Sequence, residues 1–172
     1  MLILDVIPWE IIGSLLEWAP LVVVTGAALE TVLPWGIKID AIIASPDQAP
    51  ALDHLLVDHG PVRMLHQIAG TDVFAVSLDH LIHTHQSAVN IAATDPFPLI
   101  ATITRQAPPL NISIITATHR WSFFKSGTYK KWHPAHTVLQ IHQSDTTREI
   151  TTVDDGLIAL NPGAPFWIAE TL

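Results

Sequence analysis

The chain has 172 residues, of which 49% are hydrophobic and 14% are charged, and it contains no cysteine. This length suits one domain or two small subdomains, and the composition excludes a disordered chain. The lack of cysteine excludes disulfides, thiolate metal sites and a cysteine nucleophile, and it is typical of the reducing cytoplasm, where we expect the protein.

The net charge of −8 is unevenly distributed along the sequence. Residues 1–100 contain 11 acidic and two basic residues, a net charge of −9, whereas residues 101–172 contain five acidic and six basic residues, a net charge of +1. The acidic first part argues against nucleic acid as a partner. The two parts complement each other, which favours contacts within one chain or across a homodimer, although an ordinary soluble surface would have the same composition.

The first 24 residues are apolar but show no basic n-region and no small-residue cleavage site. Acidic residues interrupt them at Asp5, Glu10 and Glu17. We therefore expect neither a signal peptide nor a membrane span. The tryptophan content is high, and we expect Trp9, Trp18, Trp35 and Trp167 in the core or in a dimer interface.

Apolar runs predict four neighbouring parallel strands, at residues 21–24, 41–44, 61–65 and 89–93. Periodic apolar residues predict helices over residues 8–18, 27–35 and 50–59, the last two stopped by glycines. A further helix is predicted from Asp72 to Ile82, with Thr71 as its N-cap. Loops 25–28 and 45–48 then follow neighbouring parallel strands, at the sheet edge where α/β proteins bind ligands.

From Asn111 onward the apolar pattern alternates with a period of two, and it is interrupted by turn residues at 126–127, 154–156 and 161–163. This pattern predicts short antiparallel strands. The expected architecture is an α/β fold in which an N-terminal, Rossmann-like parallel sheet over residues 1–108 precedes a C-terminal, β-sandwich-like region over residues 109–172.

This sequence resembles the thiamin pyrophosphokinases in three segments. Residues 25–28 (TGAA) lie where that family has a DGGA-type turn, and residues 36–48 (GIKIDAIIASPDQ) overlay its G-I-x-P-D-x-I-x-G-D-x-D-S segment. Residues 71–82 (TDVFAVSLDHLI) overlay a family helix that opens with Thr-Asp. The framework residues match, but Thr25, Ser45 and Ala69 stand where the family has acids.

Other family elements are missing from this chain. Residues 94–97 fall where a G-x-R-x-D-H element would follow, and they contain neither its Arg nor its His. Residues 161–170 show no counterpart of the C-terminal S-N-E element that helps to form the thiamin site.

The resemblance implies transfer of pyrophosphate from ATP to thiamin, with Mg²⁺ held by carboxylates, in a homodimer with an α/β part and a β part. Carried over to this sequence, the catalytic and metal-binding residues reduce to Asp47 and Asp72. The cofactor-binding positions are Thr25, Gly26, Ser45 and Thr71. Asp47 and Asp72 also have an ordinary structural explanation, in which Asp47 is a turn residue and Asp72 belongs to the first turn of a helix.

Phosphoryl transfer depends on positioned metal ions and positive charge, so the depleted acids predict weak or absent transfer. Binding of a nucleotide or of a thiamin-related molecule is compatible with this prediction. The alternative is a non-catalytic homodimer that acts as a binding or regulatory module. His80, His83 and His85 offer a separate metal hypothesis, although histidines near a helix C-terminus are also favoured by the helix dipole.

Overall fold

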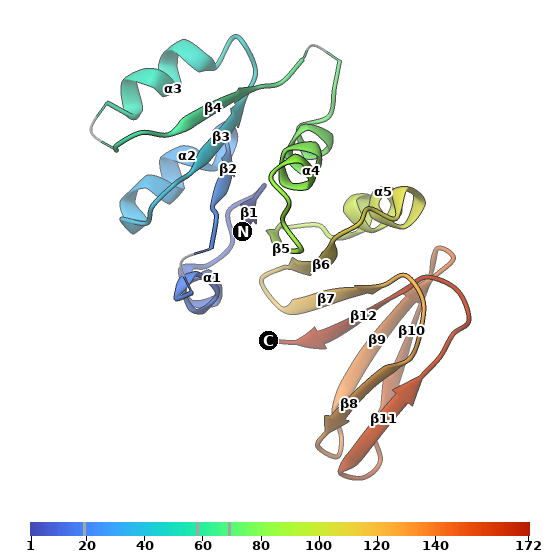
Figure 1. Cartoon of the computed structure of the whole chain (residues 1–172). Helices are drawn as coiled ribbons and strands as arrows, with labels where there is room; N and C mark the ends of the chain where they lie inside the picture. Colours follow the sequence, from blue (N-terminus) through green and yellow to red (C-terminus); the bar gives the residue numbers. More distant parts are fainter. Residues whose placement is uncertain (19, 58, 69) are drawn as a thin grey trace. The chain divides into compact units, whose positions relative to one another are not determined.

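The chain divides into two compact units, Met1–Thr94 and Asp95–Leu172, in the computed structural model, which describes residues 1–18, 20–57, 59–68 and 70–172. The first unit alternates parallel strands with helices, and the second begins with a helix and continues with antiparallel strands (Figure 1). The protein is therefore an α/β protein. The boundary between residues 108 and 109 stays a prediction.

In the first unit the strands pair in the order β5-β1-β2-β3-β4, and each neighbouring pair is parallel. The elements are β1 (Leu2–Ile3), α1 (Trp9–Leu16), β2 (Val23–Thr25), α2 (Gly26–Val32), the 3₁₀ helix η1 (Leu33–Trp35), β3 (Ala41–Ala44), α3 (Ala49–Leu55), β4 (Arg63–His66), α4 (Val73–His83) and β5 (Ala88–Ala92).

The predicted strands appear as β2, β3, β4 and β5, and β2 pairs directly with β3, as predicted. The expectation that these four strands are direct neighbours is wrong, because β1 lies between β2 and β5. The sequence analysis left Leu2 and Ile3 inside an apolar N-terminal segment. Both side chains are completely buried, since a strand in the middle of a parallel sheet is covered on both faces.

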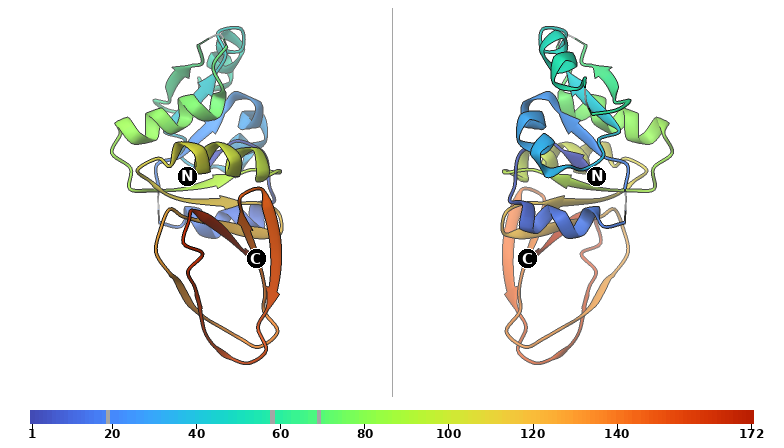
Figure 2. Two further views of the ribbon diagram at one scale, coloured as in Figure 1. Left: turned by 90° about the vertical axis from the view of Figure 1, so that its right-hand side faces the viewer. Right: turned by 90° about the vertical axis from the view of Figure 1, so that its left-hand side faces the viewer.

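Helices cover both faces of this sheet. Figure 1 shows α2 and α3 on one side of the strands and α4 on the other, and the two views in Figure 2 present α4 and α2 in turn. The chain moves across the sheet in one direction from β1 to β4 and then returns to β5. Right-handed crossovers place the returning helix on the opposite face.

The predicted helix boundaries differ in detail from those observed. The helix expected over residues 27–35 ends as α2 at Val32 and continues as the 3₁₀ turn η1, which contains Pro34. Gly36 ends this turn with a φ of 64°, as a C-terminal glycine does. The helix expected over residues 50–59 ends at Leu55, and Asp58 lies outside the described residues.

The second unit begins with a helix that the sequence analysis did not predict. Its elements are α5 (Phe97–Gln106), β6 (Asn111–Ile115), β7 (His119–Phe124), β8 (Tyr129–His133), β9 (Val138–Gln143), β10 (Thr146–Thr151), β11 (Gly156–Leu160) and β12 (Phe166–Thr171). The predicted short strands are confirmed, as are the antiparallel pairings. Five strands follow the order β10-β9-β12-β7-β6, and β8 pairs with β11 as a two-stranded ribbon.

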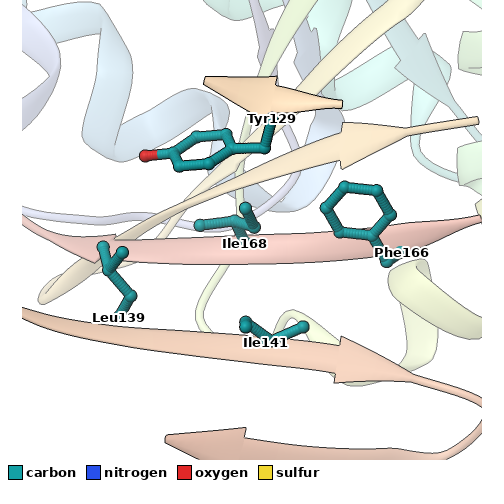
Figure 3. Close-up of a cluster of buried hydrophobic side chains, with 5 residues drawn as sticks. All are labelled: Tyr129, Leu139, Ile141, Phe166 and Ile168. Atoms are coloured by element: carbon teal, nitrogen blue, oxygen red, sulfur yellow. The ribbon is translucent and has the colours of Figure 1, made fainter. Parts of the chain in front are cut away.

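Buried side chains join this ribbon to the larger set of strands (Figure 3). The cluster consists of Tyr129 from β8, Leu139 and Ile141 from β9, and Phe166 and Ile168 from β12. Within this cluster the ring of Phe166 stacks on the ring of Phe124, and the two ring centroids are 5.1 Å apart. Burial of these side chains contributes to the stability of the second unit.

The tryptophans divide between core and surface. Trp167 is only 1% exposed and its Nε1 donates to Thr104 Oγ1 of α5 at 2.9 Å, as expected for a core residue. Trp18 is 90% exposed and Trp9 is 41% exposed, so neither belongs to the core of this chain. Within the described ranges, no helix combines the length and the apolarity that a membrane span requires.

Candidate functional site

The sequence-predicted site residues all follow parallel strands of the first unit. Thr25 and Gly26 come at the end of β2, the turn from Ser45 to Gln48 follows β3, and Thr71 and Asp72 precede α4 after β4. Because parallel strands present their carboxyl ends at one edge, these residues share that edge of the sheet. We call it the carboxyl edge.

Thr25 and Gly26 serve the packing of the unit. Thr25 is 6% exposed, and its Oγ1 donates to the carbonyl oxygen of Leu4 at 2.9 Å. A Cβ added to Gly26 would lie 3.0 Å from Leu52 Cδ1 and 3.2 Å from Gln48 Oε1. The glycine is therefore explained by the close approach of α3 and the preceding turn to the start of α2.

The turn after β3 is closed by its own hydrogen bonds. Gln48 N donates to Ser45 O at 3.0 Å, and Ser45 N donates to Gln48 Oε1 at 3.2 Å. Asp47 lies at the exposed tip of this turn. Of the predicted site residues in this turn, Asp47 is therefore the one that presents a charged group to solvent.

The N-cap of α4 differs from the prediction by one residue. Asp72, with a φ of −75° and a ψ of 135°, is the N-cap, and its Oδ1 accepts from Phe74 N at 3.2 Å. The hydroxyl of Thr71 instead donates to Ile68 O at 2.6 Å and closes the preceding turn. The predicted Thr71 cap is wrong, because that hydroxyl is already bonded to the backbone.

The sequence analysis missed Asp5 and Thr94, which meet between β1 and β5. Asp5 Oδ2 accepts from both the N and the Oγ1 of Thr94, each at 2.9 Å. The chain order reverses between these strands, and such a switch point is where open α/β sheets form ligand crevices. The available signal was Asp5 directly after a short apolar run, but the run was too short to indicate a strand.

The acidic residues near the carboxyl edge are few, and some of them are engaged in hydrogen bonds. No group of three or more His, Cys, Asp or Glu side chains in the described part of the chain could hold a metal ion. Asp72 caps a helix, and Asp5 bonds to Thr94. The aligned position Ala69 lies outside the described residues. Of the two carboxylates that the resemblance assigns to magnesium, Asp47 is exposed, whereas one oxygen of Asp72 is engaged in the cap of α4.

The histidine cluster also has local partners. His83 Nδ1 lies 2.7 Å from Asp79 O, one turn earlier in α4. Burial, followed by the nearby charges of Arg63 and His83, lowers the pKa of His80. His80 therefore tends to be neutral, because an imidazolium there would face another cation.

Comparison with solved structures identifies the fold. The chain matches thiamin pyrophosphokinase from Geobacillus thermodenitrificans with a TM-score of 0.70 at 12% identity, covering 99% of this chain and 96% of that chain. It matches thiamin pyrophosphokinase from Candida albicans with a TM-score of 0.70 at 9% identity, covering 99% of this chain and 88% of that chain.

A third match, to thiamine pyrophosphokinase from Bacillus subtilis, has a TM-score of 0.66 at 9% identity and covers 99% of this chain and 97% of that chain. No protein-family model and no curated protein matches the sequence. The three structures extend over nearly the whole chain, so the likeness includes both units. This protein therefore has the fold of the thiamin pyrophosphokinases.

Proposed function

We propose that this protein is a thiamin pyrophosphokinase-like protein in which pyrophosphoryl transfer from ATP to thiamin is weak or lost, while binding of a nucleotide or a thiamin-related molecule is retained. We further propose that it acts in the cytoplasm, with a Rossmann-like first unit and a sandwich-like second unit. The observation that carries this proposal is the engagement of the oxygens of Thr25, Thr71 and Asp72 in hydrogen bonds to the backbone.

The first unit contains few basic side chains that could neutralise the transferred group. Pyrophosphoryl transfer relies on positioning and on neutralisation of a highly anionic group, normally by Mg²⁺ and basic side chains. The first 94 residues contain two basic side chains, Lys38 and Arg63. Lys38 lies shortly before β3, and Arg63 is the first residue of β4. Both therefore belong to the edge opposite the candidate site.

Loss of one charge-stabilising group commonly costs about 2.7–4 kcal/mol of transition-state stabilisation. Thr25, Ser45 and Ala69 replace three acids of the family pattern. The three losses need not add, but partial addition would already bring the turnover close to background. Binding has a weaker requirement, because Asp47 is exposed and can meet a magnesium ion that ATP brings with it.

The test is an assay of thiamin diphosphate formation with Mg-ATP, together with isothermal titration of Mg-ATP and of thiamin. We expect turnover far below the order of 1 s⁻¹ that is ordinary for enzymes. We also expect saturable heat with at least one of the two ligands. Asp47→Asn should weaken Mg-ATP binding, whereas Asp53→Asn, which removes the same charge from an exposed position in α3, should not. Turnover on the order of 1 s⁻¹ would overturn the proposal.

A second candidate function is a non-catalytic homodimer that acts as a binding or regulatory module. The outward side of the β8–β11 ribbon favours it, since Trp132 and Leu157 are register partners and are 58% and 65% exposed. An exposed apolar pair of this kind is typical of an interface.

Light scattering at micromolar concentration should then report twice the mass of one chain. Trp132→Ser should shift the population toward the monomer, while Val57→Ser, at another exposed apolar position, should leave it unchanged. A monomer in the unsubstituted protein would rule out this candidate.

A further inference from the structure

A cavity of about 600 Å³ opens at the amino-terminal ends of β2, β3 and β4, at the edge opposite the carboxyl edge. Leu21, Pro61 and Val62 form apolar parts of its wall, and Asp40, Arg63 and His80 bring ionisable groups to it. The topology explains this set. The strands start at this edge and α4 returns to it, so the last turns of α4 meet the first residue of β4.

The charged side chains around this cavity differ in whether they already have a partner of opposite charge. Asp40 is ion-paired with Lys38, and its Oδ2 accepts from Val22 N at 2.9 Å. Burial opposes ionisation of Asp40, but the bonds from Lys38 and Val22 outweigh it and lower the pKa of this carboxyl. The negative charge of Asp40 is therefore already compensated within the protein.

Arg63 is in the opposite situation. Among the residues that the structure describes, the ion pairs are Lys38–Asp40 and Lys131–Glu170, so the guanidinium of Arg63 has no carboxylate partner there. Its charge contributes to the lowered pKa of His80, after burial. The cavity thus joins an uncompensated cation to an imidazole whose charged form a bound anion would favour.

We propose that this cavity binds a small organic anion, whose carboxylate or phosphate group pairs with Arg63 and His80 and whose apolar body contacts Leu21, Pro61 and Val62. Carboxylates and phosphates both present two oxygens that can accept a bidentate pair of N–H bonds from the planar guanidinium. The volume lies within the range of about 300–1,000 Å³ that is usual for small-molecule sites, so an inorganic ion would leave most of it to water.

The acidic surroundings do not prevent such binding. Interactions between exposed charges are largely screened beyond about 8 Å at physiological ionic strength. Arg63 is exposed, so an anion can reach its guanidinium directly, and the neighbouring apolar side chains of the cavity supply further contacts. This inference does not rest on the proposed function, because the cavity and the candidate site lie at opposite edges of the sheet.

The experiment is a titration of the ¹⁵N-labelled full chain with phenyl phosphate and, separately, with benzoate, followed by amide shifts at physiological ionic strength. We expect saturable shifts confined to residues 21, 40–41, 62–63 and 80–84, with a dissociation constant of about 0.1–1 mM for at least one anion. A stronger response to phenyl phosphate assigns a phosphate ligand, and a stronger response to benzoate assigns a carboxylate ligand.

Matched variants separate a local contact from a general charge effect. Arg63→Gln should weaken binding about tenfold or more, since it removes the bidentate partner. Lys130→Gln removes the same charge from an exposed position in the second unit and should leave binding unchanged. Benzyl alcohol, which is neutral, should not produce the shifts.

Two results would overturn the proposal. One is the lack of saturable shifts at this cavity with either anion up to about 10 mM, a concentration that would reveal even weak binding. The other is an equal weakening by Arg63→Gln and Lys130→Gln. Because the shifts are mapped residue by residue, neither result depends on whether ATP or thiamin binds at the carboxyl edge.

Discussion

Replacing Phe166 with alanine is expected to destabilise the second unit by about 3–5 kcal/mol, as is usual for a buried phenylalanine. Phe166 is 1% exposed and stacks on Phe124, within the cluster that joins β12 to β9 and to the β8–β11 ribbon (Figure 3). Truncation would remove the buried contacts of the ring and leave a cavity that the neighbouring side chains can fill only in part. The free energy of unfolding of a domain is commonly about 5–15 kcal/mol, so this substitution would remove a large part of it.

The measurement is urea unfolding followed by tryptophan fluorescence, because Trp121 and Trp167 are both buried in the same unit. Val153→Ala is the control, since Val153 also belongs to the second unit but is 78% exposed. A surface substitution of this kind should change the free energy of unfolding by no more than about 0.5 kcal/mol. Equal effects of the two substitutions would contradict the view that the cluster stabilises the unit.

The second large effect is expected at the polar side of the same ribbon. The Tyr129 hydroxyl donates to Glu170 Oε1 at 3.0 Å and lies 2.6 Å from His133 Nε2, while Lys131 forms an ion pair with Glu170. His133 is 4% exposed. Tyr129→Phe would leave the buried His133 nitrogen without this partner, and we expect a loss of about 1–3 kcal/mol in the free energy of unfolding.

The same network makes stability depend on pH through Glu170. Burial disfavours the charged form, but the hydrogen bonds from Lys131 and Tyr129 outweigh it, so the pKa of Glu170 in the folded state is lowered from 4.5. A lowered carboxyl pKa contributes stability that is fully present above the unfolded value and is lost as the pH falls through the folded value. We therefore expect the free energy of unfolding to fall below about pH 5.

This pH dependence is checked by urea unfolding between neutral and acidic pH in two variants. Glu170→Gln should flatten the acidic slope, whereas Glu149→Gln, which changes an exposed glutamate of β10, should retain it. Burial and the charge of Glu170 also raise the pKa of Tyr129, so its hydroxyl stays protonated and continues to donate over this range. An unchanged acidic slope in Glu170→Gln would show that other carboxyls control acid unfolding.

The sequence by itself determined the regular elements whose signals are local. The apolar run at Ala41–Ala44 forms a completely buried strand, and Gly36 ends a helical segment with a positive φ, as predicted. The alternating pattern after Asn111 likewise produces antiparallel strands. These features follow from steric preferences and from the burial of apolar side chains, which neighbouring residues express without help from distant ones.

Only the tertiary structure decided what the candidate site residues do. The type of side chain at Thr25 is visible in the sequence, but its hydroxyl meets the carbonyl oxygen of Leu4, 21 residues earlier, only in the folded unit. The hydroxyl of Thr71 instead meets Ile68, three residues earlier in the chain. The same dependence on the fold holds for β1 itself, since two apolar residues become a central strand only because β2 and β5 pair with them on either side. A hydrogen-bond partner that is distant in sequence leaves no local pattern, and this is why the structural role of Thr25 could not be predicted from the sequence.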